Sequence, residues 1–430
     1  MSKSEKILKR LESLHPKQID LSLNRIKILL KRLGNPERKL PPTIHVAGTN
    51  GKGSTLAFLR SIFEENNYKV HVYTSPHLIN FNERIRLNSK IITNNFLIEL
   101  LEECEFYNKN EPITFFEITT AAAYLAFSKI SSDVLLLETG LGGRFDATNV
   151  ITTTVCSVLT PISMDHMNFL GNSIKSITKE KVGIFKKNIP AVISKQNIES
   201  SAIINTESKR KNVKLYEFNK FWKVSQINPT NFNIQVGKEN FSIPVPKLFG
   251  HHQLYNSGTA FTVSKVQKTL KLRDDLTFRG IKKTFWPARM QKLKNGNLKK
   301  IVGKNFELWL DGGHNKHASD MLRFNLDDWK ESNLFLIFGM LSNKEPKEFL
   351  NEIIKYFENL YVLPVHGHEY VKSSCLKKIY FNYKQKIKSK TKVEFALEDI
   401  KNRYKEGKII ICGSLYLAGE ILKKNGTKIT

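Results

Sequence analysis

A glycine-rich turn near the amino terminus constrains this chain more than any other feature. It reads His45-Val-Ala-Gly-Thr-Asn-Gly-Lys-Gly-Ser-Thr55. The segment Ile44-His45-Val46 predicts a short strand before the turn, and a helix is expected from Ser54 to about Asn66. Glycines let the backbone curl so that successive N–H groups point at phosphate oxygens, and the order strand, glycine turn, helix is the context that such a phosphate loop requires.

Side chains of the turn also fit a phosphate site. Lys52 would place a positive charge near the β- and γ-phosphates, and the hydroxyl of Ser54 or Thr55 would reach a magnesium ion. The spacing departs from a strict Walker A motif, because only two residues separate Gly48 from the next glycine and Gly53 follows the lysine. A glycine turn without function is the alternative, but lysine and serine in phosphate-loop order favour nucleotide binding.

Apolar strands alternate with amphipathic helices along most of the chain, which predicts an α/β fold with a mostly parallel sheet covered on both faces. Around residues 205–246 alternating β-branched segments indicate a small antiparallel excursion. Past Trp286-Pro287 the β/α pattern restarts. We therefore expect an ATP-binding phosphate-loop domain at residues 1–290 and a smaller domain at residues 291–430. The expected strands are Ile44–Val46, Val70–Tyr73, Val134–Glu138, Cys156–Leu159, Ala191–Ile193, Phe306–Leu310, Leu334–Phe338, Leu360–Leu363 and Ile409–Cys412.

Charge and composition narrow the classes of function. The net charge is +28, from 68 Lys+Arg against 40 Asp+Glu, which is compatible with nucleic-acid binding. However, lysine is spread along a chain that also uses Asn and Ile heavily, so we predict no nucleic-acid partner. The charged opening resembles no signal peptide, the apolar runs are too short to span a bilayer, and the four cysteines show no metal or redox spacing. A cytoplasmic protein with no membrane association is expected.

Several polar side chains follow predicted strands, where ligands gather in parallel sheets. Ser75 follows the second strand and Glu138 ends the strand Val134–Glu138. Glu138 is either a magnesium ligand or a capping carboxylate. His166 follows the strand Cys156–Leu159, and taken alone it is more typical of a satisfied polar residue than of a ligand. Lys181 carries no signal by itself in a lysine-rich chain. A second group of polar residues, Asp311-Gly-Gly-His-Asn315, follows the strand Phe306–Leu310.

Taken in order, these motifs resemble the folylpolyglutamate synthase/dihydrofolate synthase family of the muramyl-ligase superfamily. The resemblance covers nearly the whole chain, and its fold is a phosphate-loop domain plus a smaller Rossmann-like C-terminal ligase domain. One departure is Pro287-Ala-Arg289, where the family often has Pro-Gly-Arg. The residues that carry the resemblance are Ile19–Ser22, His45–Thr55, Thr74–His77, Phe81–Arg84, Thr114–Glu117, Glu138–Asn149, Asp165-His166, Leu170-Gly171, Glu180–Ile184, Asn256, Arg289 and Asp311–Asn315.

The resemblance also implies roles for individual residues. ATP contacts are implied for Thr49, Asn50, Gly51, Lys52, Gly53, Ser54, Asn256, Arg289, Asp311 and His314. Ligands of two magnesium ions are implied at Ser75, Glu138, His166 and Lys181, the lysine being carbamylated. The pteroate site corresponds to Asp20, Leu21, Ser22, Thr114, Phe115, Phe116, Glu117, Phe145, Asp146 and Ala147. Catalytic roles fall on Lys52, Lys181, His166 and Arg289.

The activity that the resemblance implies is ATP-dependent addition of L-glutamate to dihydropteroate and to folates through an acyl phosphate, by a monomer that uses ATP and two Mg²⁺ ions. Folate polyglutamylation alone is one alternative, and a related muramyl-type ligase is another. A nucleic-acid-binding NTPase is the rival from a different class, and it would lose binding steeply with salt. The sequence leaves open the glutamate chain length, the preferred folate and any K⁺ requirement.

Overall fold

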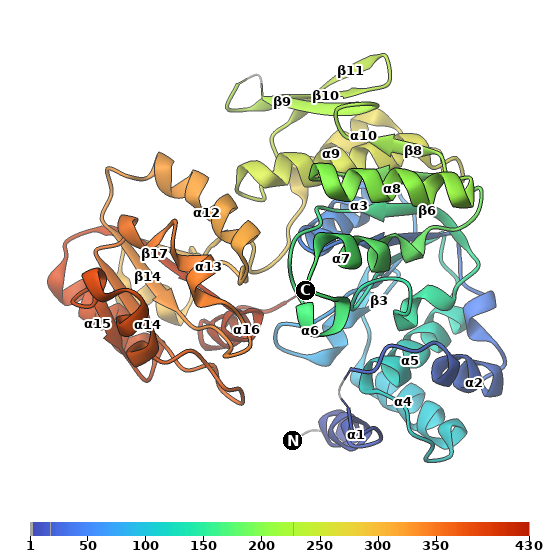
Figure 1. Ribbon diagram of the computed structural model, residues 1–430, viewed down its shortest axis with the longest axis horizontal. Coiled ribbons are helices and arrows are strands. Elements are labelled where there is room, and N and C mark those ends of the chain that lie inside the picture. The colour runs from blue at the N-terminus through green and yellow to red at the C-terminus, as the bar shows by residue number, and fades with distance from the viewer. Residues whose placement is uncertain (1–2, 18, 227, 430) are drawn as a thin grey trace. The chain divides into compact units, whose positions relative to one another are not determined.

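The computed structural model describes residues 3–17, 19–226 and 228–429. The chain divides into two compact units, which are described separately (Figure 1). Unit 1 contains the residues up to Lys247 together with Leu254–Phe285. Unit 2 contains Leu248–Gln253 and the residues from Trp286 onward.

A large sheet with strand order β4-β3-β2-β5-β1-β6-β7-β8 forms the centre of unit 1. The six strands from β2 to β8 in this order are parallel, and β3 and β4 add an antiparallel edge. Both β1 and β5 are buried along their whole length, as expected for strands covered on both faces. The strands are β1 (Thr43–Ala47), β2 (Val70–Tyr73), β3 (Ile85–Leu87), β4 (Lys90–Ile91), β5 (Val134–Glu138), β6 (Thr154–Leu159), β7 (Ala191–Ile193) and β8 (Leu215–Glu217).

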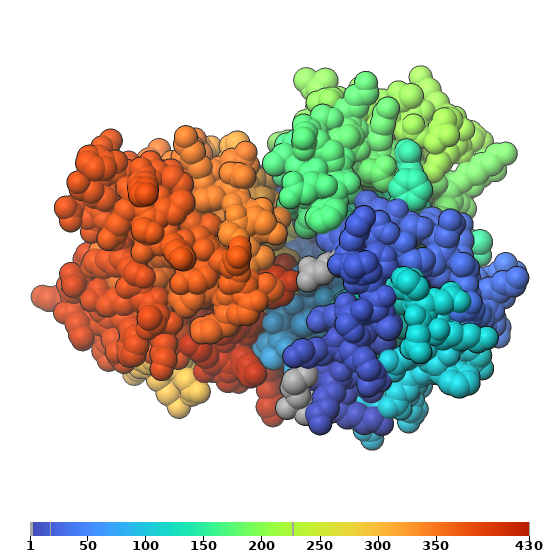
Figure 2. Space-filling model, turned by 60° about the horizontal axis from the view of Figure 1, so that its bottom comes forward, coloured from blue at the N-terminus to red at the C-terminus, as the bar shows by residue number. Residues whose placement is uncertain are grey.

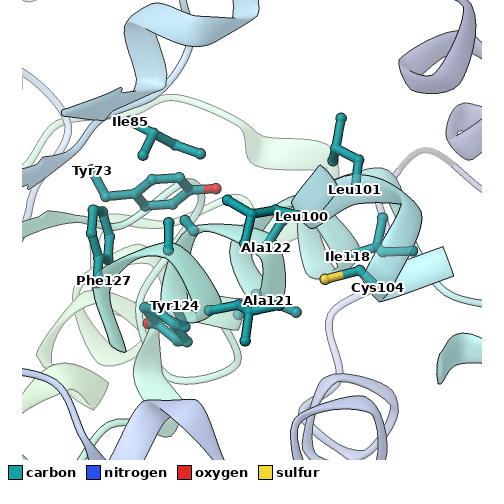
Figure 3. Close-up of a cluster of buried hydrophobic side chains, with 14 of the residues drawn as sticks. Tyr73, Ile85, Leu100, Leu101, Cys104, Ile118, Ala121, Ala122, Tyr124 and Phe127 are labelled. Carbon is teal, nitrogen blue, oxygen red and sulfur yellow. The ribbon is translucent and has the colours of Figure 1, made fainter. Parts of the chain in front are cut away.

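Helices cover this sheet. On one face α5 packs over the sheet, and its alanine-rich middle lets it lie close to α4 in a core that also holds Leu135 and Leu137 of β5. Figure 3 shows part of this core, where Tyr73 of β2 packs on the residues of α5. The helices of unit 1 are α1 (Lys3–Glu12), α2 (Asn24–Arg32), α3 (Lys52–Glu65), α4 (Asn94–Asn108), α5 (Phe115–Lys129), α6 (Met167–Leu170), α7 (Ile174–Lys181), α8 (Ile198–Lys211), α10 (Asp274–Lys283) and most of α9 (His251–Val266).

The amino-terminal helices add a layer beside α4 and α5. Figure 2 shows these residues in blue on the surface, next to the cyan residues of α4. Ile7 and Leu11 of α1 and Ile26 and Leu29 of α2 join the same core, because apolar residues recur at helical spacing on each helix. The segment between them, residues 19–22, is thereby held against the start of α5, a position that matters for the site below.

The antiparallel excursion is shorter than residues 205–246. It consists of β9 (Trp222–Gln226), β10 (Asn231–Val236) and β11 (Glu239–Pro244), paired in the order β11-β10-β9. Residues 205–211 instead continue α8, and β8 joins the parallel sheet next to β7. The buried alternation of Phe232, Ile234 and Val236 on β10 explains why this part of the sequence reads as antiparallel strand.

Unit 2 is a second α/β body with strand order β12-β13-β17-β14-β15-β16. All neighbouring strands are parallel except the β12–β13 pair. Its strands are β12 (Gln291–Lys292), β13 (Phe306–Leu310), β14 (Leu334–Phe338), β15 (Asn359–Val362), β16 (Ile387–Ser389) and β17 (Gly407–Cys412). Its helices are α11 (Asn297–Val302), α12 (Lys316–Asp328), α13 (Pro346–Leu350), α14 (Ser373–Ile379), α15 (Val393–Arg403) and α16 (Leu415–Lys424).

The predicted α/β architecture with a mostly parallel central sheet is confirmed. Among the described residues, no helix combines the length and apolar character needed to cross a bilayer. The assignment of residues 1–290 and 291–430 to an ATP-binding domain and a ligase domain stays a prediction.

Candidate active site

The glycine-rich turn joins β1 to α3, as predicted, and its glycines leave no room for side chains. At Gly48, where φ is +151°, an added Cβ would lie 1.9 Å from the Thr160 hydroxyl. At Gly51, where φ is +87°, it would lie 2.6 Å from Oδ1 of Asn256. Asn256 is buried on α9, so the structure brings this predicted nucleotide contact directly against the loop. Glycine is therefore required at both positions for close approach as well as for backbone conformation.

The segment after β6 supports the loop from behind. The backbone N–H groups of Thr49 and Asn50 both donate to the Pro161 carbonyl, at 2.9 and 3.2 Å. The Thr49 hydroxyl donates to the Ser163 carbonyl at 3.0 Å, and the Asn50 amide reaches the Ser163 hydroxyl at 3.1 Å. These bonds fix the turn between two neighbouring strands of the sheet.

Two lysines meet at one carbonyl oxygen of the loop. Lys52 Nζ donates to the Gly48 carbonyl at 3.1 Å and lies 3.4 Å from the Thr49 carbonyl, and Lys181 Nζ donates to the same Gly48 oxygen at 2.9 Å. Lys181 is only 5% exposed. Burial, with a smaller contribution from the Lys52 charge, lowers the pKa of Lys181 to about 7. A lysine that carries no signal in the sequence is thus placed in contact with the phosphate loop.

Three of the four predicted metal residues lie at or after the carboxyl ends of parallel strands. Ser75 follows β2, Glu138 ends β5 and His166 lies in the segment after β6. The buried Glu138 carboxylate accepts from the Ser75 backbone N–H at 3.1 Å. His166 adopts φ +52° at the start of α6, and its ring is 3.9 Å from the Asp165 carboxylate. In the sheet β5 and β6 flank β1, and β2 pairs with β5; because all four strands are parallel, the three residues lie at the same edge of the sheet as the phosphate loop.

Beside these strand ends lies a pocket of about 210 Å³. Nine of the ten residues predicted for the acid substrate line it, and Ser75 and His166 line it as well. Phe115 does not; its ring packs edge-on against Phe81 at 5.9 Å. The lining residues are Ile19, Asp20, Leu21, Ser22, Ser75, Pro76, Arg84, Thr114, Phe116, Glu117, Gly140, Leu141, Phe145, Asp146, Ala147 and His166.

One arginine ties two walls of this pocket together. Arg25 on α2 donates from Nη1 to the Asp20 carboxylate and from Nη2 to the Asp20 carbonyl, both at 2.7 Å. Its Nε donates to Glu117 Oε2 at 2.9 Å. Glu117 also accepts from the backbone N–H and the hydroxyl of Thr114, as the third residue of the capping box that starts α5. The other carboxylate oxygen of Glu117 is buried with no partner among the described residues.

Several residues in or beside the pocket had no role predicted from the sequence. Arg84 stands in a motif of the resemblance but had no assigned role; it lines the pocket, and its Nε donates to His77 Nδ1 at 3.0 Å. Gly140 also lines it, and an added Cβ there would lie 2.4 Å from the Phe116 ring. Arg25 gave no signal because it reads as one more cation on the polar face of a helix. Only the contact to Glu117, 92 positions away, distinguishes it.

In unit 2 the polar strand end after β13 is organised around Asp311. This buried carboxylate accepts from the backbone N–H groups of Met290 and Gly313 at 2.8 and 2.7 Å. Burial raises the pKa of Asp311, and the Arg289 charge and these hydrogen bonds oppose the shift. The His314 ring contacts the Gly312 carbonyl at 3.1 Å. Arg289, Asp311 and His314 therefore form one local group within unit 2.

Within the described ranges, no three His, Cys, Asp or Glu side chains are grouped closely enough to hold a metal by themselves. The residues around the phosphate loop nevertheless fit Mg²⁺, because this ion is typically bound by one or two carboxylates together with water and substrate phosphates. Glu138 provides such a carboxylate next to Ser75.

A phosphate loop on a parallel sheet, joined to a second α/β unit, is the architecture of the Mur ligases. Residues 46–264 match the family described as Mur ligase middle domain, and residues 293–424 match the family described as dihydrofolate synthetase, C-terminal domain. The chain belongs to the dihydrofolate synthase/folylpolyglutamate synthase family.

Similar proteins match nearly the whole chain. The chain is 30% identical to a dihydrofolate synthase/folylpolyglutamate synthase of Bacillus subtilis, over 94% of both chains. Its fold matches that of E. coli FolC in complex with DHPP and ADP, with a TM-score of 0.88, 28% identity, and coverage of 98% of this chain and 97% of that one. The bifunctional enzyme of Yersinia pestis complexed with AMPPNP and Mn gives a TM-score of 0.87 at 28% identity, over 98% of both chains.

Proposed function

We propose that this enzyme adds L-glutamate to dihydropteroate and to folates in an ATP-dependent reaction that passes through an acyl phosphate. The observation that carries the proposal is the pocket beside the phosphate loop. It is lined by residues expected for a pteroate-type acid, and also by Ser75 and His166, which follow strands at the same edge of the sheet as the loop. An acid bound there lies next to the place where a nucleotide phosphate would be held.

The pocket suits a flat aromatic acid. Phe116, Phe145 and Leu141 supply apolar surface, and the buried Glu117 and Asp146 supply acceptors for ring N–H groups. A pocket that is mainly apolar with a few placed polar groups fixes the orientation of its ligand. Glutamate, which is small and highly charged, does not match this lining and would bind elsewhere.

The reaction brings a carboxylate to a phosphoryl group, and both are anions. We assign to Lys52, at the phosphate loop, the neutralisation of phosphate charge. Arg289, next to the predicted domain boundary, and His314, from the ligase domain of residues 291–430, contribute to it. Thr49–Ser54 and Asn256 bind the nucleotide and Asp311 orients Arg289. Positioning and charge neutralisation then account for most of the rate enhancement, as in other phosphoryl transfers.

Two Mg²⁺ ions are proposed to bind with the nucleotide, held by Ser75, Glu138, His166 and carbamylated Lys181. When bound, they would neutralise phosphate charge. A free ammonium would repel the ions, so the chain must supply Lys181 as a neutral amine that reacts with CO₂ to give an anionic carbamate. The burial of Lys181 and its lowered pKa support this assignment, since an amine with pKa about 7 is half neutral near that pH.

The test is ADP release with glutamate and, in turn, dihydropteroate and a tetrahydrofolate. Release with both acids supports the bifunctional proposal, and release with tetrahydrofolate alone would reduce it to folate polyglutamylation. Ser22→Trp, which puts a large ring into the pocket wall, should abolish acid-dependent release while nucleotide binding persists. Ser13→Trp, at an exposed site beyond the pocket, is the matched control.

Three further expectations belong to the same proposal: the enzyme acts as a monomer, in the cytoplasm, and without a nucleic-acid or membrane partner. Nucleic-acid binding would appear as retention on a polyanion with a steep salt dependence. The alternative result is retention on the polyanion at low salt only, with an ATP turnover that the polyanion does not change. In that case the positive charge of the protein reflects a lysine-rich composition and not a nucleic-acid-binding function.

A further inference from the structure

Behind the pocket runs a buried hydrogen-bonded line that starts on β1. Nε2 of His45 lies 2.9 Å from the Thr148 hydroxyl, and the Thr148 hydroxyl donates to Oδ1 of Asp146. All three residues are buried, with exposed fractions of 0%, 0% and 2%. Asp146 lines the pocket, whereas His45 and Thr148 do not. The line therefore connects a strand of the central sheet to the pocket wall.

The chemistry of the line fixes its direction. An ionised carboxylate only accepts, so the single hydrogen of the Thr148 hydroxyl goes to Asp146. The Thr148 oxygen must then accept from His45, which makes His45 the neutral tautomer with hydrogen on Nε2. Burial and the Lys186 charge lower the pKa of His45 to about 3, in agreement with a neutral ring. Nδ1 of His45 has no partner among the described residues, so the bond to Thr148 is the one the ring is placed to make.

Asp146 in turn organises the loop that forms the pocket wall. Its Oδ2 accepts from the Leu141 backbone N–H at 2.7 Å, and its Oδ1 accepts from the Thr148 backbone N–H at 3.0 Å. Thr148 is held from another side as well, because its carbonyl accepts from the Tyr124 hydroxyl at 2.8 Å. Tyr124 is a residue of α5 and belongs to the buried cluster drawn in Figure 3. Five pocket-lining residues, numbered from 140 to 147, lie on this loop.

We propose that His45 and Thr148 are positioning residues for the acid-substrate pocket: they fix Asp146, and through it the wall of residues 140–147, against the aromatic acid. This inference rests on the proposed function. It assigns His45, three residues before the first loop glycine, to the acid pocket, not to the nucleotide. Buried polar groups are normally hydrogen-bonded, so burying the His45 imidazole with one unpaired nitrogen costs free energy. The role proposed for His45 explains why this cost is tolerated.

The test compares variants that keep or remove each hydrogen-bonding group. His45→Leu removes the donor, whereas His45→Gln places an amide N–H near the position of Nε2. Thr148→Val removes the hydroxyl at nearly constant shape, and Thr148→Ser keeps it. The KM for dihydropteroate should rise about five- to tenfold in His45→Leu and Thr148→Val, the loss expected for one buried hydrogen bond, and should stay within about twofold of wild type in His45→Gln and Thr148→Ser.

A merely structural role predicts a different pattern, so the KM values for ATP and glutamate are measured in parallel. They should stay within about twofold in every variant, and the double variant His45→Leu/Thr148→Val should be no worse than Thr148→Val alone, because both act through one line. Equal changes in all three KM values, an unchanged KM for dihydropteroate in Thr148→Val, or additive effects would overturn the inference. If His45→Leu does not fold, the threonine pair decides. Failure of the proposed function is distinct, because wild type itself would then lack acid-dependent ADP release.

Discussion

Replacing Arg25 with alanine should open the wall formed by residues 19–22. Arg25 makes three hydrogen bonds, two to Asp20 and one to Glu117, and its own side chain is 22% exposed. Without it, Asp20 loses its tie to α2, and the Glu117 carboxylate loses its cation while remaining buried. The substitution therefore perturbs both the mobility of the loop and the charge balance inside the pocket.

The expected magnitude follows from the burial of each partner. The Asp20 side chain is about one-third exposed, so its ion pair with Arg25 contributes roughly 1 kcal/mol or less. The Glu117 side chain is 4% exposed, and breaking a buried pair costs about 3–5 kcal/mol; the two remaining bonds from Thr114 place the value near the lower end. We expect a loss of about 3 kcal/mol in the free energy of unfolding. Loss of roughly 1.4 kcal/mol of loop ordering would raise the KM for dihydropteroate about tenfold.

Chemical unfolding and steady-state kinetics test the two parts separately. Arg32→Ala is the matched control, because Arg32 lies on the same helix and pairs with Glu111 at an exposed site outside the pocket. It should cost less than about 1 kcal/mol and leave every KM unchanged. Arg25→Lys should be intermediate, since an ammonium keeps the charge but not the planar fork. An Arg25→Ala enzyme with wild-type KM for the acid would refute the proposed role of this wall.

Three further outcomes are expected. Lys52→Ala should reduce ligation by at least about a hundredfold, whereas loss of the amine's bonds to the Gly48 and Thr49 carbonyls should lower the free energy of unfolding by only about 1 kcal/mol. Near-normal turnover would contradict the phosphate-loop assignment. Gly48→Ala should lose nucleotide binding, measured by calorimetry, because the added Cβ overlaps the Thr160 hydroxyl. In CO₂-free buffer, wild type should gain stability relative to Lys181→Met as pH rises from about 7 to 10.5, because the unfolded chain keeps a proton that the folded chain has lost. Bicarbonate should restore activity and add stability to wild type but not to Lys181→Met, because CO₂ reacts with the neutral amine of the folded chain and one proton is released. A wild-type stability that bicarbonate does not raise would argue against carbamylation.

The parallel sheet could be predicted because its strands are buried on both faces and so read as continuous apolar runs. Val134–Glu138 and Phe306–Leu310 were predicted with the bounds that the structure has. Short or half-exposed elements were harder. The edge strand β4 spans only Lys90–Ile91, and the edge strand β16 is partly exposed and contains a lysine. Neither strand therefore forms the continuous apolar run from which the central strands were predicted.

The site residues likewise differ in how far the sequence alone could predict them. The phosphate loop was recognisable because glycine and lysine spacing is local, and the pocket residues were recognisable only through the family resemblance. The roles of Arg25 and His45 were missed because each depends on a contact between residues far apart in the sequence. The separation is 92 positions for Arg25–Glu117 and 103 positions for His45–Thr148. A buried histidine in a strand and an arginine on a helix are ordinary in sequence, and only tertiary packing shows what they touch.

The carbonyl of Gly48 shows how burial and charge combine at this site. Two lysine amines donate to that one oxygen, and the proximity of Lys52 is one of the causes that lower the pKa of Lys181. Two cations that share one neutral acceptor in a dry environment repel each other, so the arrangement favours either loss of a proton or arrival of an anion. A nucleotide phosphate near Lys52 and a carbamate on Lys181 would each remove that repulsion. The loop and the buried lysine should therefore be energetically coupled. With metal present, nucleotide should bind more strongly to the carbamylated enzyme than to the unmodified one. Without metal it should not, because the carbamate and the phosphate repel each other.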